Sequence, residues 1–259
     1  MCCVFESFAK RETPAKIESE DASSPSLFHT KYIPTDYEKA ARVYKSIVAK
    51  ISLSARELIE NAFLTFRPEK ELMVLKFLQL GYKTGSKVMN HITEESVDFL
   101  LKIVHHLTFE AMRFRQFVRF SICDGVLVAE IEPKNFVLPL IMEHFCERYA
   151  DDSFLIYDKT HKQALVYNKG RSDIIYLDEW QMPEIDDDEY KYRVLWKQFF
   201  ETVAIKERIN PRCQRNFMPI WYRAHMTEFM KVDEERLARI RLDEKVQKTL
   251  AETIPQQKT

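Results

Sequence analysis

The sequence predicts an α+β protein in which helices come first, a small antiparallel sheet follows, and further helices end the chain. Apolar residues recur at helical spacing through residues 36–116, and the pattern then changes to alternation between residues 117 and 177. An Asp-Gly pair separates the first two alternating segments and is a strong hairpin signal. We therefore expect an N-terminal helical layer packed on a sheet made of a hairpin and a three-strand meander.

The composition excludes several classes of protein. The chain has 259 residues, of which 46% are hydrophobic, so it can bury a core. Its 39 basic and 40 acidic residues give a net charge of -1, so overall charge does not attract it to nucleic acid or to an acidic membrane. No apolar run is long enough for a membrane span, and the N-terminus lacks the pattern of a signal peptide. We expect a cytoplasmic protein without membrane association.

Three segments are expected along the chain. Residues 10–26 combine Pro, Ser and charge without periodicity, which is typical of a flexible linker. We therefore assign residues 1–26 to a truncated N-terminal helix and this linker, residues 27–230 to a single α+β domain, and residues 231–259 to a charged helix and a polar tail.

Four helices are predicted before the sheet. Asp36 is the expected N-cap of the first helix, and Ser54 with Glu57 forms a capping box for the second. Residues 69–80 are apolar nearly all round and predict a buried helix that ends at one of two nearby glycines. A long helix over residues 93–116 follows.

The outer face of the long helix carries a basic stripe. Helical spacing brings Lys102, His106 and Arg113 to this face, and Arg119 in the next segment extends it. A nucleic-acid contact is one interpretation of the stripe. The alternative is an ordinary solvated face, because an amphipathic helix needs no function for its polar side.

The sheet is predicted from five alternating segments. Residues 117–122 and 126–131 flank Asp124-Gly125 and predict the hairpin. Residues 154–158, 164–168 and 173–177 are joined by links too short for a crossover, so they are expected to pair antiparallel. A short helix is expected between the hairpin and the meander.

The C-terminal helices surround a basic and aromatic segment. The acidic residues 186–189 open one helix, where negative charge favours its N-terminus. Asn210-Pro211 and Met218-Pro219 each resemble a cap followed by proline at the first helical position. A charged helix is expected from Asp233 onward.

Residues 205–225 hold five basic residues and one acidic residue. Guanidinium groups bind phosphates, and aromatic rings stack on exposed bases, so this segment is a candidate contact for single-stranded or damaged DNA. The candidate nucleic-acid-binding residues are Arg208, Arg212, Arg215, Trp221, Tyr222 and Arg223. In the alternative interpretation, the aromatic residues are core and the arginines pair with the acidic residues 186–189.

Several motifs in order carry a family resemblance. They are FVRF at residues 117–120, IEP at 131–133, VLPL at 137–140, HF-x-ER-Y at 144–149 and NPR-x-QRNFMP-x-WY at 210–222. Together they resemble a bacterial family of unknown function whose members are described as DNA metabolism or DNA repair proteins. The resemblance spans roughly residues 1–229 and is specific because the motifs match in order.

The resemblance implies a context rather than a mechanism. Members of that family are commonly encoded beside a radical SAM protein, and some are fused to a uracil-DNA glycosylase domain. The expected partners are therefore DNA and a radical SAM protein, with a uracil-DNA glycosylase domain as a further candidate. The family typically opens with a strand resembling YDG-x-F-x-G, whereas this chain begins at MCCVFESF. That difference predicts an N-terminal strand lost through truncation or a misplaced start.

Weak catalytic candidates lie after the hairpin. Glu130, Glu132 and Lys134 resemble the carboxylates and lysine of metal-dependent nucleases. Against this, Asp124 has a role in the turn and Pro133 interrupts the motif. His144 with Glu147 provides too few ligands for a metal, and four glycines leave no phosphate-binding loop, so we expect neither a metal nor a cofactor.

Three functions remain open from the sequence. The first is a DNA-binding component of DNA metabolism that works with a radical SAM protein. The second is a metal-dependent nuclease or lesion-processing hydrolase that uses Glu130, Glu132 and Lys134. The third is an adaptor that binds only proteins, in which the arginines contact an acidic partner.

Overall fold

The structure is a computed structural model that describes residues 1–18 and 29–253, without the side chains of 206, 244 and 246–253. The chain divides into two compact units. Unit 1 comprises Met1–Met112 and Pro133–Leu140, and unit 2 comprises Arg113–Glu132 and Ile141–Thr259. Residues 19–26 of the predicted linker and residues 254–259 of the predicted polar tail lie outside the described residues.

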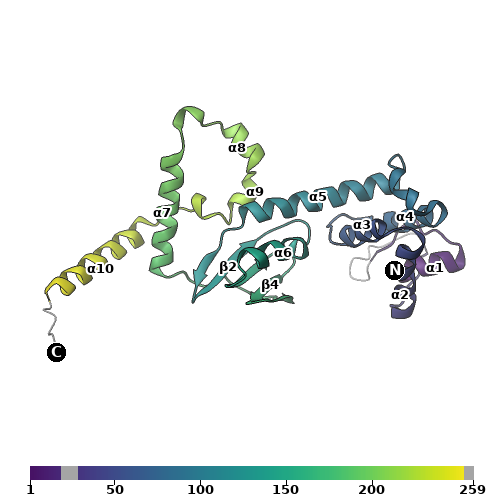
Figure 1. Cartoon of the computed structure of the whole chain (residues 1–259), viewed down its shortest axis with the longest axis horizontal. Helices are drawn as coiled ribbons and strands as arrows, with labels where there is room; N and C mark the ends of the chain where they lie inside the picture. The colour runs from purple at the N-terminus through teal and green to yellow at the C-terminus, as the bar shows by residue number, and fades with distance from the viewer. Residues whose placement is uncertain (19–28, 254–259) are drawn as a thin grey trace. The chain divides into compact units, whose positions relative to one another are not determined.

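Unit 1 is helical. Its elements in chain order are α1 (Cys2–Lys10), α2 (Tyr37–Lys50), α3 (Leu53–Phe63), α4 (Lys70–Thr84), the 3-10 helix η2 (Gly85–Asn90) and most of α5 (Glu95–Phe117) (Figure 1). These helices bury one apolar cluster that includes Ile47, Leu75, Phe77 and Leu100. The helices predicted before the sheet are therefore confirmed.

The ends of these helices follow local chemistry. Asp36 caps α2, as predicted, by accepting a hydrogen bond from the main-chain N–H of Lys39 at 3.0 Å. The cap of α3 is Ser52 and not Ser54, because the Ser52 side chain accepts from Ala55 N at 3.1 Å and the helix begins two residues early. Gly85 ends α4 with φ of 63°, a conformation that glycine adopts without strain.

Glu110 anchors a loop inside unit 1. This carboxylate is buried and accepts hydrogen bonds from the main-chain N–H groups of Lys134 and Asn135 and from the Asn135 side chain, at 2.6 to 3.0 Å. Asn135 in turn accepts from the main-chain N–H of Phe66 at 3.2 Å. The loop is therefore tied to both α5 and the end of α3.

Unit 2 contains a five-stranded sheet of mixed direction. The strands are β1 (Ser121–Cys123), β2 (Val126–Ile131), β3 (Ser153–Asp158), β4 (Gln163–Asn168) and β5 (Arg171–Tyr176), and they lie side by side in that order. The predicted hairpin and meander are confirmed as antiparallel pairs.

The sheet also contains a pairing that the sequence prediction missed. The strands β2 and β3 are parallel, with Ile131 opposite Asp158, because α6 (Leu138–Arg148) connects them as a crossover. The prediction of an entirely antiparallel sheet was wrong at this pair. The first predicted strand was also too long, since α5 continues to Phe117 and β1 begins only at Ser121.

Local turns and an aromatic cluster stabilise the sheet. Asp124 and Gly125 have φ of 50° and 79°, as a tight hairpin turn between β1 and β2 requires. Phe145 of α6 and Tyr149 just after it pack edge to face against Phe120 and Phe154, with ring centroids 5.0 to 6.4 Å apart. One face of the sheet is thereby covered by α6 within unit 2.

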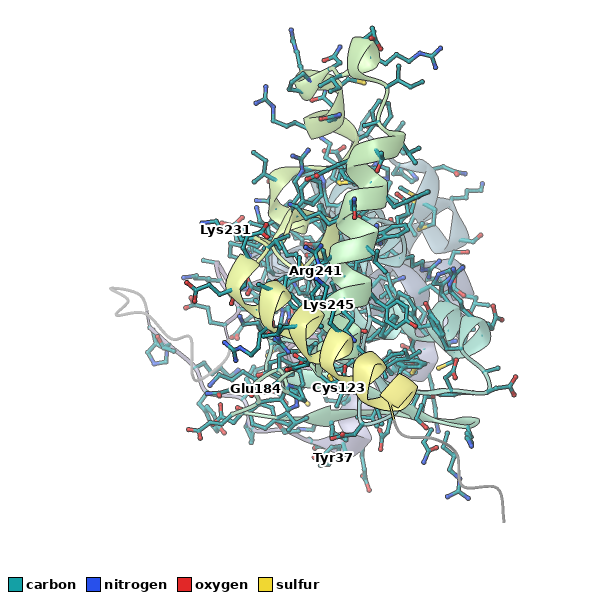
Figure 2. The ribbon with its side chains drawn as sticks, turned by 90° about the vertical axis from the view of Figure 1, so that its left-hand side faces the viewer. Tyr37, Cys123, Glu184, Lys231, Arg241 and Lys245 are labelled. Carbon is teal, nitrogen blue, oxygen red and sulfur yellow. The ribbon has the colours of Figure 1, made fainter. Side chains whose placement is uncertain are left out.

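The remaining elements of unit 2 are helical. They are α7 (Asp187–Val203), η3 (Lys206–Arg208), α8 (Pro211–Phe217), α9 (Ile220–Arg223), η4 (Thr227–Phe229) and α10 (Glu234–Thr253). Tyr190 of α7 packs with Leu237 and Ile240 of α10 in a small apolar cluster. Figure 2 views α10 from the front, with Lys231 before it and Arg241 and Lys245 on it.

No helix in the described part of the chain has the length and apolarity to cross a membrane. The fold class is the predicted mixture of N-terminal helices, a small sheet and C-terminal helices.

Candidate nucleic-acid interface

The arginine-rich segment forms two short helices. Asn210 caps α8 by accepting from Cys213 N at 3.0 Å, and Pro211 occupies the first turn, as predicted. The second prediction was wrong by one position. Pro219 is itself the cap residue of α9, which begins at Ile220. The two helices carry Arg212 and Arg215 on one and Trp221, Tyr222 and Arg223 on the other.

Arg208, Arg212 and Arg215 are exposed to solvent. Within the parts of the chain that the structure describes, none of the three forms an ion pair or a side-chain hydrogen bond. Phe217 and Trp221 beside them expose 69% and 52% of their surface, so they are not core residues. The guanidinium groups of Arg212 and Arg215 and the rings of Phe217 and Trp221 are therefore all exposed to solvent.

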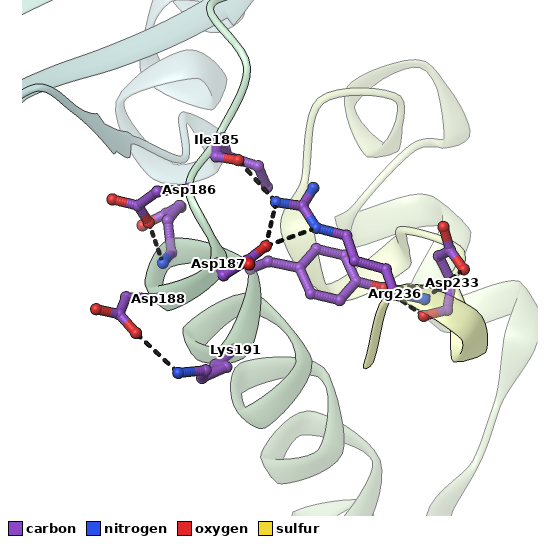
Figure 3. A network of polar contacts seen from close by, with 9 residues as sticks. Ile185, Asp186, Asp187, Asp188, Lys191, Asp233 and Arg236 are labelled. Carbon is purple, nitrogen blue, oxygen red and sulfur yellow. Dashed lines mark hydrogen bonds and ion pairs between the residues drawn. The ribbon is translucent and has the colours of Figure 1, made fainter. Parts of the chain in front are cut away.

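The acidic residues 186–189 have other partners (Figure 3). Asp186 caps α7 by accepting from Glu189 N at 2.7 Å, and Asp188 pairs with Lys191 at 2.8 Å. Asp187 pairs with Arg236 of α10 at 2.8 Å. Glu189 pairs with Arg193 at 2.9 Å. The predicted capping role is confirmed. Asp187, Asp188 and Glu189 pair with cations on α7 and α10. Among the described residues they form no ion pair with the arginines of η3 and α8.

Tyr222 and Arg223 instead hold the segment in place. Tyr222 packs against Phe114 and Phe117, with ring centroids 5.0 and 5.3 Å apart. Arg223 donates two hydrogen bonds to the carbonyl oxygen of Met218 at 3.1 and 3.2 Å and lies over the ring of Phe229. These two predicted contact residues therefore have contacts within the chain, whereas the prediction that they bind DNA stays a prediction.

A cluster of charged side chains lies next to Trp221. Glu130 of β2 and Glu132, which directly follows β2, are two residues apart, and both contact Lys159 and His225. Lys159 Nζ lies 3.0 Å from Glu132 and 3.5 Å from Glu130. His225 lies between the same carboxylates, with Nδ1 3.4 Å from Glu130 and Nε2 3.2 Å from Glu132. The Nε2 contact is close but is not aligned as a hydrogen bond.

The ion pair between Glu132 and Lys159 shifts the pKa values of both side chains toward their charged forms. The hydrogen bond from Lys159 is the main cause that lowers the pKa of Glu132, and the charge of His225 adds to it. The same bond raises the pKa of Lys159. Because the two charged forms stabilise each other, Lys159 stays protonated and is a poor nucleophile at neutral pH.

The turn that carries Lys159 is built on Asp158. This buried carboxylate accepts hydrogen bonds from the main-chain N–H groups of Thr160 and His161 at 3.0 and 3.1 Å. Its second oxygen lies 2.7 Å from Nδ1 of His161. Parallel pairing sets the ends of β2 and β3 side by side, and the turn therefore holds Lys159 opposite Glu132.

A small pocket separates the cluster from the aromatic residues. It is lined by Phe114, Phe117, Val118, Glu130, Ile131, Glu132, Trp221, Tyr222 and His225 and has a volume of about 10 Å³. That volume is about the size of one water molecule and too small for a nucleobase. The surface of Trp221, and not this pocket, is therefore the place at which a base can stack.

The structure assigns Lys134 to a different unit from Glu130 and Glu132, the other two catalytic candidates. Lys134 lies in unit 1, where its main chain binds Glu110, and the lysine of the carboxylate cluster is Lys159. Lys159 and His225 were missed because nothing in their spacing links them to residues 130–132. The parallel pairing of β2 and β3, which brings Lys159 there, has no local sequence signal.

The predicted basic stripe also divides between the units. Lys102 and His106 belong to unit 1, where Lys102 pairs with Asp98 at 2.7 Å. Arg113 and Arg119 belong to unit 2, where Arg113 donates to the carbonyl oxygen of Phe217 and Arg119 pairs with a buried carboxylate, that of Glu228. Lys102, Arg113 and Arg119 thus have polar partners within the chain.

The carboxylate cluster does not meet the pattern of a metal site. Among the described residues, no group of three or more His, Cys, Asp and Glu side chains has the arrangement to hold a metal ion. In the cluster itself, an ammonium group and an imidazole already contact the two carboxylates.

Comparisons with known proteins identify the chain by family. No curated protein and no solved structure matches it. One family model does match, over residues 68–228, a range that contains the cluster and the arginines and covers more than half of the chain. The chain therefore belongs to the family of the domain of unknown function DUF4130.

Proposed function

We propose that this chain is a DNA-binding component of DNA metabolism and that α8 and α9 form its contact with DNA. The observation that carries the proposal is the exposure of Arg212 and Arg215 without an acidic partner in the described part of the chain, beside the exposed rings of Phe217 and Trp221. Arginines bind phosphates and release counterions, while exposed rings stack on unpaired bases. Single-stranded DNA is the substrate class that offers both.

The charge distribution supports local binding by a nearly neutral protein. The net charge of the whole chain is -1, so long-range attraction is weak. The segment 205–225 carries five basic residues against one acidic residue, and the nearby acids 186–189 are engaged on α7 and α10. The arginines are therefore available for phosphates at little cost in broken ion pairs.

The family resemblance supplies the context of the proposal. Proteins that this chain resembles are described as DNA metabolism or DNA repair proteins, and a radical SAM protein is the expected partner. A uracil-DNA glycosylase domain is a further candidate partner. In this proposal the chain holds a single-stranded or damaged segment while a partner performs the chemistry.

Fluorescence anisotropy with a labelled oligonucleotide tests the proposal. The variant Arg212→Ala/Arg215→Ala is expected to bind single-stranded DNA about 10- to 100-fold more weakly at low salt. The matched control is Lys169→Ala/Arg171→Ala, which removes two exposed cations from the turn between β4 and β5. Equal loss in both variants would show that binding depends on net charge alone and would overturn the assignment to α8.

The two alternatives predict different results. A nuclease or hydrolase would shorten or modify labelled DNA in the presence of Mg²⁺ or Mn²⁺, whereas a binding component leaves it intact. The contacts of Glu130 and Glu132 with Lys159 and His225 favour a structural role for these carboxylates. An adaptor for proteins alone would fail to bind DNA at low salt.

A further inference from the structure

A stripe of large apolar side chains on α7 faces solvent. It consists of Tyr192, Leu195, Phe199 and Val203, which expose 69%, 58%, 56% and 61% of their surfaces. Their spacing of three, four and four residues places them on one side of the helix. We call this set the α7 stripe.

The α7 stripe is distinct from the face that α7 uses inside unit 2. Tyr190 and Val194 lie on the opposite side and pack with Leu237 and Ile240 of α10. The helix is therefore apolar on two sides, of which one is covered by α10. Contiguous exposed apolar surface of this kind marks contact with another macromolecule.

We propose that the α7 stripe is the contact surface of a homodimer, in which α7 packs antiparallel against α7 of a second copy of this chain. The spacing of the stripe is that of a seam between two packed helices. A two-fold axis near residue 197 places Leu195 of one copy against Phe199 of the other, and the reverse contact forms at the same time.

Charge complementarity favours a second copy in the antiparallel direction. Acidic residues lie at the start of α7, and Asp188 lies beside the stripe. Arg208 follows the end of α7, is exposed and forms no ion pair among the described residues. With this axis, antiparallel packing brings the acidic start of each α7 to the end of the other α7, which leads into Arg208, whereas parallel packing would set acid against acid.

The direction of the helix dipoles agrees with this arrangement. The N-terminal end of each α7 would lie near the C-terminal end of the other, where opposite partial charges meet. In the dimer Arg208 serves the contact between copies, and Arg212 and Arg215 of both copies stay exposed for phosphates. The dimer is independent of DNA binding and can form whether or not DNA is bound.

Analytical ultracentrifugation of the full chain over a concentration series tests the proposal. A contact made by four apolar side chains from each copy is expected to give a dimer with Kd of about 1 to 100 µM. Leu195→Glu is expected to shift the chain to a monomer, by a factor of at least about 100 in Kd. The matched control is Leu242→Glu on α10, because Leu242 is exposed to a similar extent, 61%.

A charge exchange tests the antiparallel register. Asp188→Arg and Arg208→Asp are each expected to weaken the dimer by about 5- to 50-fold, and the two changes in one chain are expected to restore it. Circular dichroism of each variant establishes that helix content is retained. Failure of the double variant to recover would overturn the antiparallel contact.

Three further results would overturn the homodimer itself. The first is a wild-type chain that sediments as a monomer at about 0.5 mM, well above the expected Kd. The second is a Leu195→Glu variant that remains dimeric. The third is an equal increase of the dimer Kd in Leu195→Glu and Leu242→Glu. Because DNA is absent from these experiments, each result is independent of the DNA-binding proposal.

Discussion

The indole N–H of Trp221 donates a hydrogen bond to the main-chain carbonyl of Glu132, with 2.9 Å between nitrogen and oxygen. The side chain of the same Glu132 contacts His225, four residues after Trp221. Two contacts to one residue thus fix the segment of α9 against the end of β2. The exposed face of Trp221 is held in a defined position, which reduces the entropy lost when a base stacks on it.

Replacing the indole separates its two roles. Trp221→Phe is expected to lose the hydrogen bond to Glu132 and about 1 kcal/mol of unfolding free energy, while it keeps a ring for stacking. Trp221→Ala is expected to lose a further 1 to 3 kcal/mol of binding free energy for single-stranded DNA, by rough estimate. Urea unfolding and anisotropy measure the two quantities. Equal DNA affinity of the two variants would show that the ring does not stack on a base.

The pair of Arg119 and Glu228 is expected to contribute strongly to stability. Glu228 is buried, at 3% exposure, and contacts Arg119 Nη2 at 2.8 Å and Nε at 3.3 Å. Arg119→Ala leaves this carboxylate buried without its main partner, so we expect a loss of about 2 to 4 kcal/mol in unfolding free energy.

Adding Glu228→Gln to Arg119→Ala is expected to recover part of that loss, because the double variant buries no charge. A double-mutant cycle in urea measures the coupling between the two side chains. Additive effects of the two substitutions would contradict a direct interaction.

Unfolding in acid tests the ion pair between Lys159 and Glu132. The pKa of Glu132 is lowered in the folded state, so its contribution is present above its ordinary pKa of 4.5 and is lost as pH falls through the lower folded value. The pKa of Lys159 is raised, so its contribution is present below 10.5 and is lost as pH rises through the higher folded value.

Lys159→Met is therefore expected to flatten the loss of unfolding free energy between pH 7 and the acid range below 4.5. The control Lys169→Met removes an exposed lysine from the turn between β4 and β5, where it does not contact Glu132. Identical pH profiles for wild type and Lys159→Met would contradict the assigned cause.

The Glu110 carboxylate is expected to hold the loop around residues 133–136. It accepts three hydrogen bonds from Lys134 and Asn135. Glu110→Ala leaves these buried donors without an acceptor, so we expect a loss of about 2 to 4 kcal/mol and much faster amide exchange at Asn135. Hydrogen exchange followed by mass spectrometry measures the change. Unchanged protection of the loop would show that other contacts hold it.

Local sequence signals predicted the elements that local interactions determine. Asp36 caps α2, the Asp124-Gly125 turn joins β1 to β2, and the acidic residues begin α7, because each effect acts within a few residues. One failure was also local. Ser52 and Ser54 are both good cap residues, and the side chain of Ser52 is the one that caps α3.

The charged site depended on contacts that no local pattern contains. Glu130 and Glu132 were recognised as a pair, but Lys159 and His225 come to them from a distant turn and from the segment after α9. The parallel pairing of β2 with β3 creates the first of these contacts. Because the predicted sheet was entirely antiparallel, the prediction did not bring residues 132 and 159 together.

The exposure of Arg212 and Arg215 could be established only from the structure. The sequence left open whether Arg212 and Arg215 pair with the acids 186–189. The acids are instead engaged by Lys191, Arg193 and Arg236, of which the last lies about 50 residues away on α10. The contact between Asp187 and Arg236 has no signal in the local sequence.

The salt dependence of single-stranded DNA binding tests the central claim most directly. If Arg212 and Arg215 each neutralise a phosphate, the slope of log K against log salt will be more negative in the wild type than in Arg212→Ala/Arg215→Ala by about 1.4. Lys169→Ala/Arg171→Ala will keep the wild-type slope. A wild-type slope near zero, or the same slope in all three proteins, would contradict a phosphate contact by these arginines.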